Sequence, residues 1–146
     1  MRSITKFLGI ALICTSVSSH AAVKNLQEVD FFQAEMEVDS VHTSDAGNTF
    51  QASFSGKAGS YGRVYLSYDF TNKQQLADMG EFTGFAWAQN GETVVTATLQ
   101  GSWVKVGTIF KLYSIDSVSN GKLNLAVGEI DFVAKTLRFD VSELKH

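Results

Sequence analysis

The chain has 146 residues, with 12 Lys and Arg against 15 Asp and Glu, and a formal net charge of −3. It contains 12 glycines, one cysteine and no proline, which fits a chain of closely spaced strands and hairpins. The acidic balance and the absence of a Lys/Arg cluster argue against binding to nucleic acid or to an anionic membrane surface.

Residues 1–21 are predicted to be a secretion signal. Arg2 and Lys6 precede an apolar run over residues 7–17, and small residues near Ala21 favour cleavage after it. The run is shorter than the roughly 20 apolar residues that a membrane span requires. We therefore expect a soluble product without a membrane span, secreted or periplasmic after cleavage.

Removal of the signal leaves residues 22–146, which we expect to form one β-barrel domain with a net charge near −5. The single cysteine, Cys14, is lost with the signal, so no disulfide or cysteine-based metal site is expected in the mature protein. A lipid-anchored Cys14 is the weaker interpretation, because Ile13 precedes it where a lipoprotein signal has a small residue. Nothing in the sequence indicates a metal or a cofactor.

Alternation of apolar and polar residues predicts antiparallel strands along this domain. Residues 32–39 alternate strictly and predict a strand with one buried face. Residues 49–54 repeat the pattern after a turn rich in Ser, Asp, Gly and Asn at 44–48. Residues 60–70 carry large side chains on both faces, so the pattern leaves open which of these faces is inside, and the same holds for 123–132.

Residues 71–79 interrupt the alternation and predict a short turn of helix. Asn72 can cap it, Leu76 and Met79 have helical spacing, and Gly80 can end it. We expect this to be the one short helix beside the strands.

The clearest turn signal is Asn90-Gly91, the preferred dipeptide of a two-residue type I′ hairpin. With this dipeptide as the loop, Trp87 lies across from Val94. The same register places bulky side chains on one face of the hairpin and small ones on the other, as a tight barrel interior requires.

Eight strands are expected, joined by hairpins. They cover residues 32–39, 49–54, 60–70, 82–89, 92–106, 108–115, 123–132 and 137–141. A closed antiparallel barrel is the leading all-β architecture, because closure removes the exposed sheet edges; a two-sheet β-sandwich is the alternative. Asp131 and Arg138 are expected to lie opposite each other as an exposed ion pair.

Two carboxylates are weak candidates for catalysis. Glu129 shares a strand face with Asp131, at a spacing that suits acid and base roles, although an outward polar edge is the plainer interpretation. Asp69 shares a face with Tyr65 and Ser67; if that face is inward, burial raises its pKa and suits proton transfer, and otherwise it is solvated. Finding both Asp69 and Glu129 on the outer wall would exclude this use.

Aromatic side chains with polar tips come from four strands. Such side chains often line a cavity for an apolar or amphipathic ligand, and ordinary core packing is the alternative. The predicted ligand-binding residues are Tyr65, Tyr68, Trp87, Trp103 and Tyr113.

The glycine-punctuated segments at 80–84, 91 and 99–103, with Phe54-Ser55-Gly56, resemble the hairpins of the allene-oxide-cyclase-like barrels, in the wider group of lipocalin-like barrels. The resemblance covers roughly residues 50–141 and implies an eight-stranded barrel with an apolar cavity. Members of that group are cyclases, ligand binders or proteins of unknown role. No residue matches a cyclase's catalytic set, so no catalytic role is carried over.

The sequence is compatible with three functions. The leading hypothesis is a secreted or periplasmic barrel that binds a small apolar or amphipathic molecule. The second is a cyclase, isomerase or lyase on the same barrel with a buried carboxylate, Asp69 or Glu129, as the base. The third is a structural or interaction protein whose aromatic outer face meets another chain, such as a second copy in a homo-oligomer.

Overall fold

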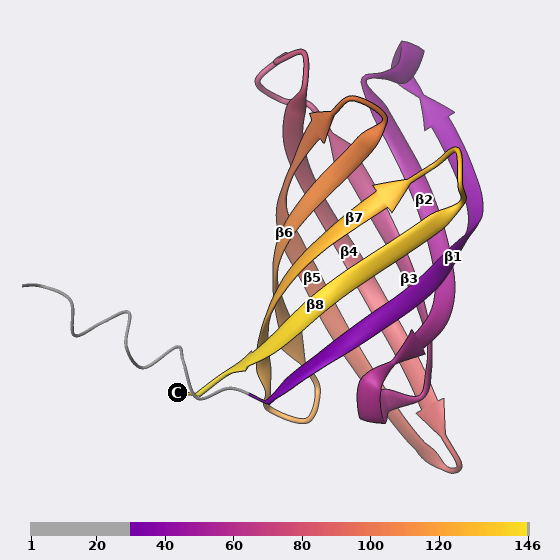
Figure 1. Ribbon diagram of the computed structural model, residues 1–146, viewed down its shortest axis with the longest axis vertical. Helices are drawn as coiled ribbons and strands as arrows, with labels where there is room; N and C mark the ends of the chain where they lie inside the picture. Colours follow the sequence, from indigo (N-terminus) through magenta and orange to yellow (C-terminus); the bar gives the residue numbers. More distant parts are fainter. Residues whose placement is uncertain (1–29, 146) are drawn as a thin grey trace, which may run out of the picture.

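The computed structural model describes residues 30–145, which form a closed antiparallel barrel of eight strands (Figure 1). The strands are β1 (Phe31–Ser44), β2 (Thr49–Ala58), β3 (Arg63–Thr71), β4 (Met79–Asn90), β5 (Thr93–Val106), β6 (Ile109–Val118), β7 (Leu123–Asp131) and β8 (Thr136–Leu144), with 3-10 turns η1 (Asp45–Gly47) and η2 (Gly59–Tyr61). Each strand pairs with its neighbours in the chain, and β1 also pairs with β8. The predicted eight-stranded barrel is confirmed, and the alternative sandwich is not formed.

The predicted signal at residues 1–21 lies outside the described residues. Within residues 30–145, no helix is long and apolar enough to cross a membrane.

Period-two alternation places one row of side chains from every strand inside the barrel. Phe54 on β2, Phe70 on β3 and Leu112 on β6 are almost completely buried. The structure also decides the two faces that the sequence left open. Leu66 on β3 and Ala126 on β7 belong to the inward rows.

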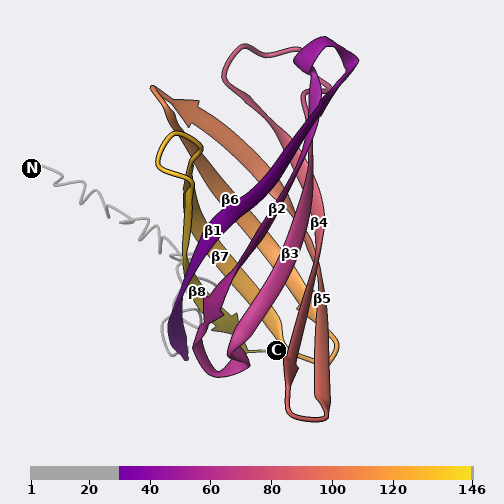
Figure 2. The ribbon, with the colours of Figure 1, turned by 90° about the vertical axis from the view of Figure 1, so that its right-hand side faces the viewer.

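The barrel interior divides into two halves along its axis. At the end that carries η1 (Figure 2), aromatic rings fill the lumen; Phe50 and Phe70 stack at 4.5 Å between centroids, and Phe110 meets Phe132 edge-on at 5.3 Å. We call this the aromatic half, formed by Phe50, Phe70, Phe82, Trp103, Phe110 and Phe132. The other end holds the β4–β5 hairpin and the end of β8 (Figure 1). We call it the alanine half, because its inward residues include Ala34, Ala58, Ala86, Ala88, Ala97 and Ala126.

The helix predicted at 71–79 is not formed, and this prediction is wrong. No residue between β3 and β4 is helical, and Met79 already belongs to β4 and pairs with Val104 of β5. The Asn72 side chain instead accepts a hydrogen bond from the backbone N–H of Leu76 at 2.9 Å and donates one to its carbonyl oxygen. These two bonds close a compact loop.

The loop between β4 and β5 is Gly91-Glu92, one residue later than predicted. Of these two residues Gly91 alone has a positive φ, 63°, the pattern of a type II′ turn rather than the predicted type I′. Trp87 consequently lies across from Thr96 and not Val94. Because the register differs by two positions, the predicted inward and outward faces are unchanged.

At the turn between β7 and β8, Arg138 lies across from Glu129 and not from Asp131. The Oδ1 atom of Asp131 accepts hydrogen bonds from the backbone N–H groups of Val133 and Ala134, both at 2.9 Å. The carboxylate therefore caps the turn, and the expected pairing with Arg138 is wrong.

Two inward glycines make room for large rings on the neighbouring strand. Gly84 lies opposite Tyr68, and Gly128 lies opposite Phe139. A β-carbon on Gly84 would lie 2.5 Å from both Cδ1 of Tyr68 and the carbonyl oxygen of Ser67, far inside van der Waals contact. A β-carbon on Gly128 would overlap the ring of Phe139 in the same way.

We expect Gly84→Ala to lower the free energy of unfolding by about 1–3 kcal/mol, because the added methyl group displaces the Tyr68 ring or the adjoining backbone. Urea denaturation measures the change. Ser67→Ala, an exposed site on the paired strand, is the control and should stay within about 0.5 kcal/mol of the parent protein. Equal free energies of unfolding for the two variants would contradict the prediction, because they would show that the Tyr68 ring accommodates the added methyl group without loss of stability.

Candidate functional site

The alanine half of the barrel contains a cavity of about 80 Å³. The cavity exists because the small alanine side chains leave the lumen unfilled. Its wall is mainly apolar, and Leu66, Leu99 and Phe139 complete it deeper along the strands. Phe32 and Tyr61 border the cavity from β1 and η2, with ring centroids 5.8 Å apart. The volume suits a small organic molecule and is below the roughly 300 Å³ of a pocket for a drug-sized ligand.

Polar side chains interrupt this apolar wall. Tyr68 from β3, Asp116 from β6 and Asn124 from β7 line the cavity. Asp116 and Asn124 face each other in the β6–β7 ladder, and Ser114 lies two residues before Asp116 in the same inward row. We call these four residues the polar cluster. Tyr68, Ser114 and Asn124 are at most 5% exposed, so the barrel buries polar groups here at a cost in free energy.

Burial perturbs the two titratable groups of the polar cluster. It raises the pKa of Asp116 from 3.8 to about 6, while a hydrogen bond donated by the Ser114 hydroxyl lowers this pKa in part. The pKa of Tyr68 is raised well above its ordinary value, first by burial and then by the negative charge of Asp116. The phenol of Tyr68 therefore lies within electrostatic range of the Asp116 carboxyl group.

The polar cluster has unused hydrogen-bonding capacity. Among residues 30–145, Ser114 is the one hydrogen-bond partner of the Asp116 side chain, and the side chains of Tyr68 and Asn124 have none. No Lys, Arg or His in this part of the chain forms an ion pair with Asp116. A guest molecule can therefore bond to a carboxyl, a phenol and an amide that the protein leaves available.

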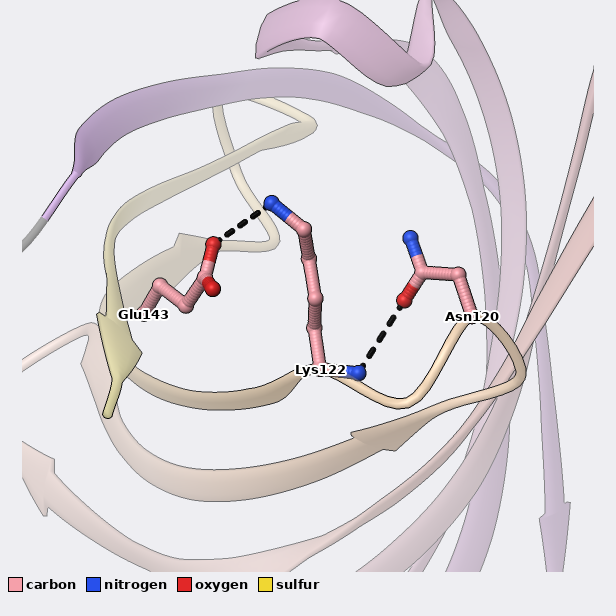
Figure 3. A network of polar contacts seen from close by, with 3 residues as sticks. All are labelled: Asn120, Lys122 and Glu143. Carbon is pink, nitrogen blue, oxygen red and sulfur yellow. Dashed lines mark hydrogen bonds and ion pairs between the residues drawn. The ribbon is translucent and has the colours of Figure 1, made fainter. Parts of the chain in front are cut away.

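An ion pair lies at the same end of the barrel. Nζ of Lys122 is 2.6 Å from Oε2 of Glu143 (Figure 3), and the backbone N–H of Lys122 donates to Oδ1 of Asn120 at 3.2 Å. The hydrogen bond to Glu143 and its negative charge raise the pKa of Lys122. Because Lys122 is paired with Glu143, this ion pair supplies no free positive charge to Asp116.

Two of the five predicted aromatic ligand residues are inside the barrel. Tyr68 lines the cavity. Trp103 is buried in the aromatic half, where its Nε1–H donates to the carbonyl oxygen of Thr71 at 3.2 Å. Trp103 therefore fills the lumen of the aromatic half. It does not line the cavity, although it was predicted to bind the ligand.

The other three predicted ligand residues have their side chains on the outer wall; Tyr65 and Tyr113 do not line the cavity, whereas Trp87 borders it. Tyr65, Trp87 and Tyr113 are 47%, 38% and 47% exposed. Trp87 borders the cavity, but its ring lies 5.9 Å from that of Tyr65 on the outside. Tyr65 is three residues from the inward Tyr68, and an odd separation on a strand places two side chains on opposite faces.

The two predicted catalytic carboxylates also lie on the outer wall. Asp69 is exposed and accepts a hydrogen bond from Nε2 of Gln51 at 2.5 Å. Glu129 is exposed, and its Oε1 is 3.8 Å from Nζ of Lys111. This position excludes Asp69 and Glu129 as bases inside the barrel.

Asp116, the half-buried carboxylate that lines the cavity, was not among the predicted site residues. The predicted strand ended at residue 115, although the inward row of Leu112 and Ser114 reaches Asp116 if the alternation is continued. An acidic residue in an apolar row was the signal. Among residues 30–145, no group of three or more His, Cys, Asp and Glu side chains is placed to hold a metal ion.

We expect Asp116→Asn to change how stability depends on pH. Between pH 4 and 6 the unfolded chain releases the Asp116 proton and the folded protein keeps it, so the free energy of unfolding falls as pH rises through this window and stays low above it. The difference between 3.8 and about 6 corresponds to ~3 kcal/mol. The free energy of unfolding of Asp116→Asn minus that of the parent protein should therefore rise by about 2–3 kcal/mol from pH 4 to pH 7.5. Urea denaturation at the two pH values measures this difference.

Asp69→Asn is the matched control, since it removes a carboxylate from the outer wall and leaves the cavity intact. Its effect on unfolding free energy should vary much less over the same pH range. An effect of Asp116→Asn that is the same at pH 4 and pH 7.5 would contradict burial of this carboxyl group.

In comparisons with protein-family models, curated proteins and solved structures, nothing matches this chain. The closed barrel agrees with the architecture that the resemblance to allene-oxide-cyclase-like proteins implied, but an architecture of this kind does not identify a family or a function. The function has to be argued from the chemistry of the cavity.

Proposed function

We propose that this protein binds a small hydrophobic or amphipathic molecule in the alanine half of its barrel. The observation that carries the proposal is the apolar cavity of about 80 Å³ with the polar cluster in its wall. Unfilled apolar space costs stability at about 24 cal/mol per Å³, or ~2 kcal/mol for this cavity. The aromatic half demonstrates that the same barrel accommodates larger inward side chains, so the alanines are not imposed by the fold.

The composition of the wall supports an oriented ligand rather than a loosely held one. Small-molecule sites are largely apolar and contain a few placed polar groups that fix orientation. Tyr68, Asp116 and Asn124 supply such groups from three different strands. The apolar remainder of the wall supplies the transfer free energy.

Filling the cavity should abolish binding. We expect Ala86→Leu to occupy the space of the ligand, whereas Ala134→Leu, in the exposed turn between β7 and β8, should bind as the parent does. NMR titration with benzene, benzyl alcohol and benzylamine measures binding through the methyl signals of lining residues such as Ala97 and Val141. The proposal fails if none of these probes perturbs the lining residues, or if Ala86→Leu binds them all unchanged.

A second candidate is a cyclase, isomerase or lyase on the same cavity. It is favoured by the position of Asp116, a half-buried carboxylate in the cavity wall whose pKa burial raises to about 6, because a general acid or base works best with a pKa near the working pH. Native mass spectrometry of protein from its own compartment, followed by denaturation, recovers any bound molecule. A binder returns this molecule unchanged after incubation with fresh protein, whereas an enzyme converts it.

A third candidate is an interaction protein. Exposed apolar side chains gather on β6 and β7, where Tyr113 lies across from Val127 and Ile115 across from Leu125. Patches of this kind often mark protein interfaces. Sedimentation equilibrium tests it, because a face that pairs with a second copy produces a stable dimer.

The proposed place of action is the periplasm or the extracellular space, after removal of residues 1–21. We expect the intact mass of the exported protein to correspond to a chain that begins at Ala22. A full-length mass for the exported protein would contradict cleavage at this position.

A further inference from the structure

We propose that the ligand of this cavity is a small hydrophobic amine, whose ammonium group pairs with the Asp116 carboxylate while its apolar part contacts the alanine wall. This inference rests on the proposed function and adds the chemical class of the ligand. The charge and the hydrogen-bonding groups of the cavity wall support this class of ligand.

The charge of the cavity is negative and uncompensated. Around Asp116, the neighbouring strands present Leu99 from β5 and Asn124 from β7, neither of which is charged. The deeper wall adds Phe139 and Tyr68, and the negative charge of Asp116 contributes to the raised pKa of Tyr68. A buried carboxylate without a counter-ion is costly, and a cationic guest supplies the missing partner.

The charges at the end of the barrel do not supply that partner. Lys122 is bonded to Glu143, and the negative charge of Asp30 also acts on Lys122. The other cation in an ion pair of the described chain, Lys111, lies on the outer wall beside Glu129. No Lys, Arg or His among the described residues lines the cavity, so an ammonium ion that enters it meets no positive charge in the wall.

The hydrogen-bonding groups of the cavity match a primary ammonium group. This group has three N–H donors and no acceptor. The cavity offers three kinds of acceptor, namely the carboxylate of Asp116, the amide oxygen of Asn124 and the phenol oxygen of Tyr68. An anionic ligand is repelled by Asp116, and an alcohol carries no charge to pair with the carboxylate and has a single donor.

The protonation of Asp116 makes amine binding depend on pH. An alkylammonium group resembles Lys, whose ordinary pKa is near 10.4, and stays charged at neutral pH. Burial raises the pKa of Asp116 to about 6, so the carboxylate is the form present above pH 6 and is lost as pH falls below it. Affinity for the amine should therefore rise through pH 6 and level off above pH 7, as the competent fraction approaches one.

The test compares probes of similar shape and different charge: benzylamine, benzyl alcohol and benzoate. Isothermal titration calorimetry at pH 7.5 should give benzylamine at least tenfold higher affinity than either other probe. At pH 5 the affinity for benzylamine should fall about tenfold, because about one tenth of Asp116 is then ionised, while the affinity for benzyl alcohol changes little.

Three variants separate charge recognition from effects on the fold. Asp116→Asn should lower the affinity for benzylamine at least tenfold and leave that for benzyl alcohol within about threefold, which also reports an intact cavity. Asn124→Ala removes a neutral acceptor and should weaken benzylamine more than benzyl alcohol. Asp69→Asn on the outer wall should change neither affinity.

The outcomes distinguish this inference from the proposed function. Equal affinities for benzylamine and benzyl alcohol, or unchanged benzylamine affinity in Asp116→Asn, overturn the amine assignment while a ligand-binding barrel stands. Binding of benzoate in preference to benzylamine overturns it in the same way. Absence of all cavity binding, with Ala86→Leu indistinguishable from the parent, overturns the proposed function as well.

Discussion

The pairing of β1 with β8 is the constraint on which the rest of the structure depends. Seven residue pairs join the two strands, from Phe31 with Ser142 to Glu37 with Thr136. This ladder removes the edges that an open sheet would expose and turns one face of every strand into an interior. It ends where the register of β1 shifts after Val38, and beyond that point β1 continues with β2 alone.

Closure with eight strands leaves a lumen that side chains alone can fill, so the inward residues decide whether the barrel is solid or hollow. The aromatic half is solid, because rings such as Phe50 and Phe70 interlock across it. Two inward glycines also serve packing, since Gly84 and Gly128 accept the rings of Tyr68 and Phe139 on the neighbouring strands. The alanine half is hollow, and the cavity follows from side-chain volume rather than from a change in the backbone.

Stability and function make opposite demands on the hollow half. An apolar side chain in place of Asp116 would remove the cost of burying a carboxyl group, and larger residues in place of the alanines would fill the cavity. A barrel selected for stability alone would contain neither feature. Sites that reduce stability in this way are expected where a protein binds or transforms a ligand, and this connects the packing of the barrel to the proposed function.

The alternation of residues along the chain was enough to predict the strands, their hairpin order and the closed barrel, because a period of two reports directly that one strand face is buried. It was enough to assign the small inward face of the β4–β5 hairpin, though not its loop, since a register change of two residues preserves every face. It failed at Asn72, where a side chain bonded to the backbone of Leu76 replaced the expected helix.

Only the tertiary structure decided which side of β3 and β7 is inside and which polar residues meet. Tyr65 and Tyr68 are both compatible with a cavity when β3 is considered alone, and Asp69 and Asp116 are both acidic residues in strands. The choice between them depends on strands distant in the sequence, because closure through β1 and β8 determines the inward face of the whole sheet at once. The alternation along each strand determined which residues share a face. Only the closed barrel places Asp116 of β6 and Tyr68 of β3 in the wall of one cavity.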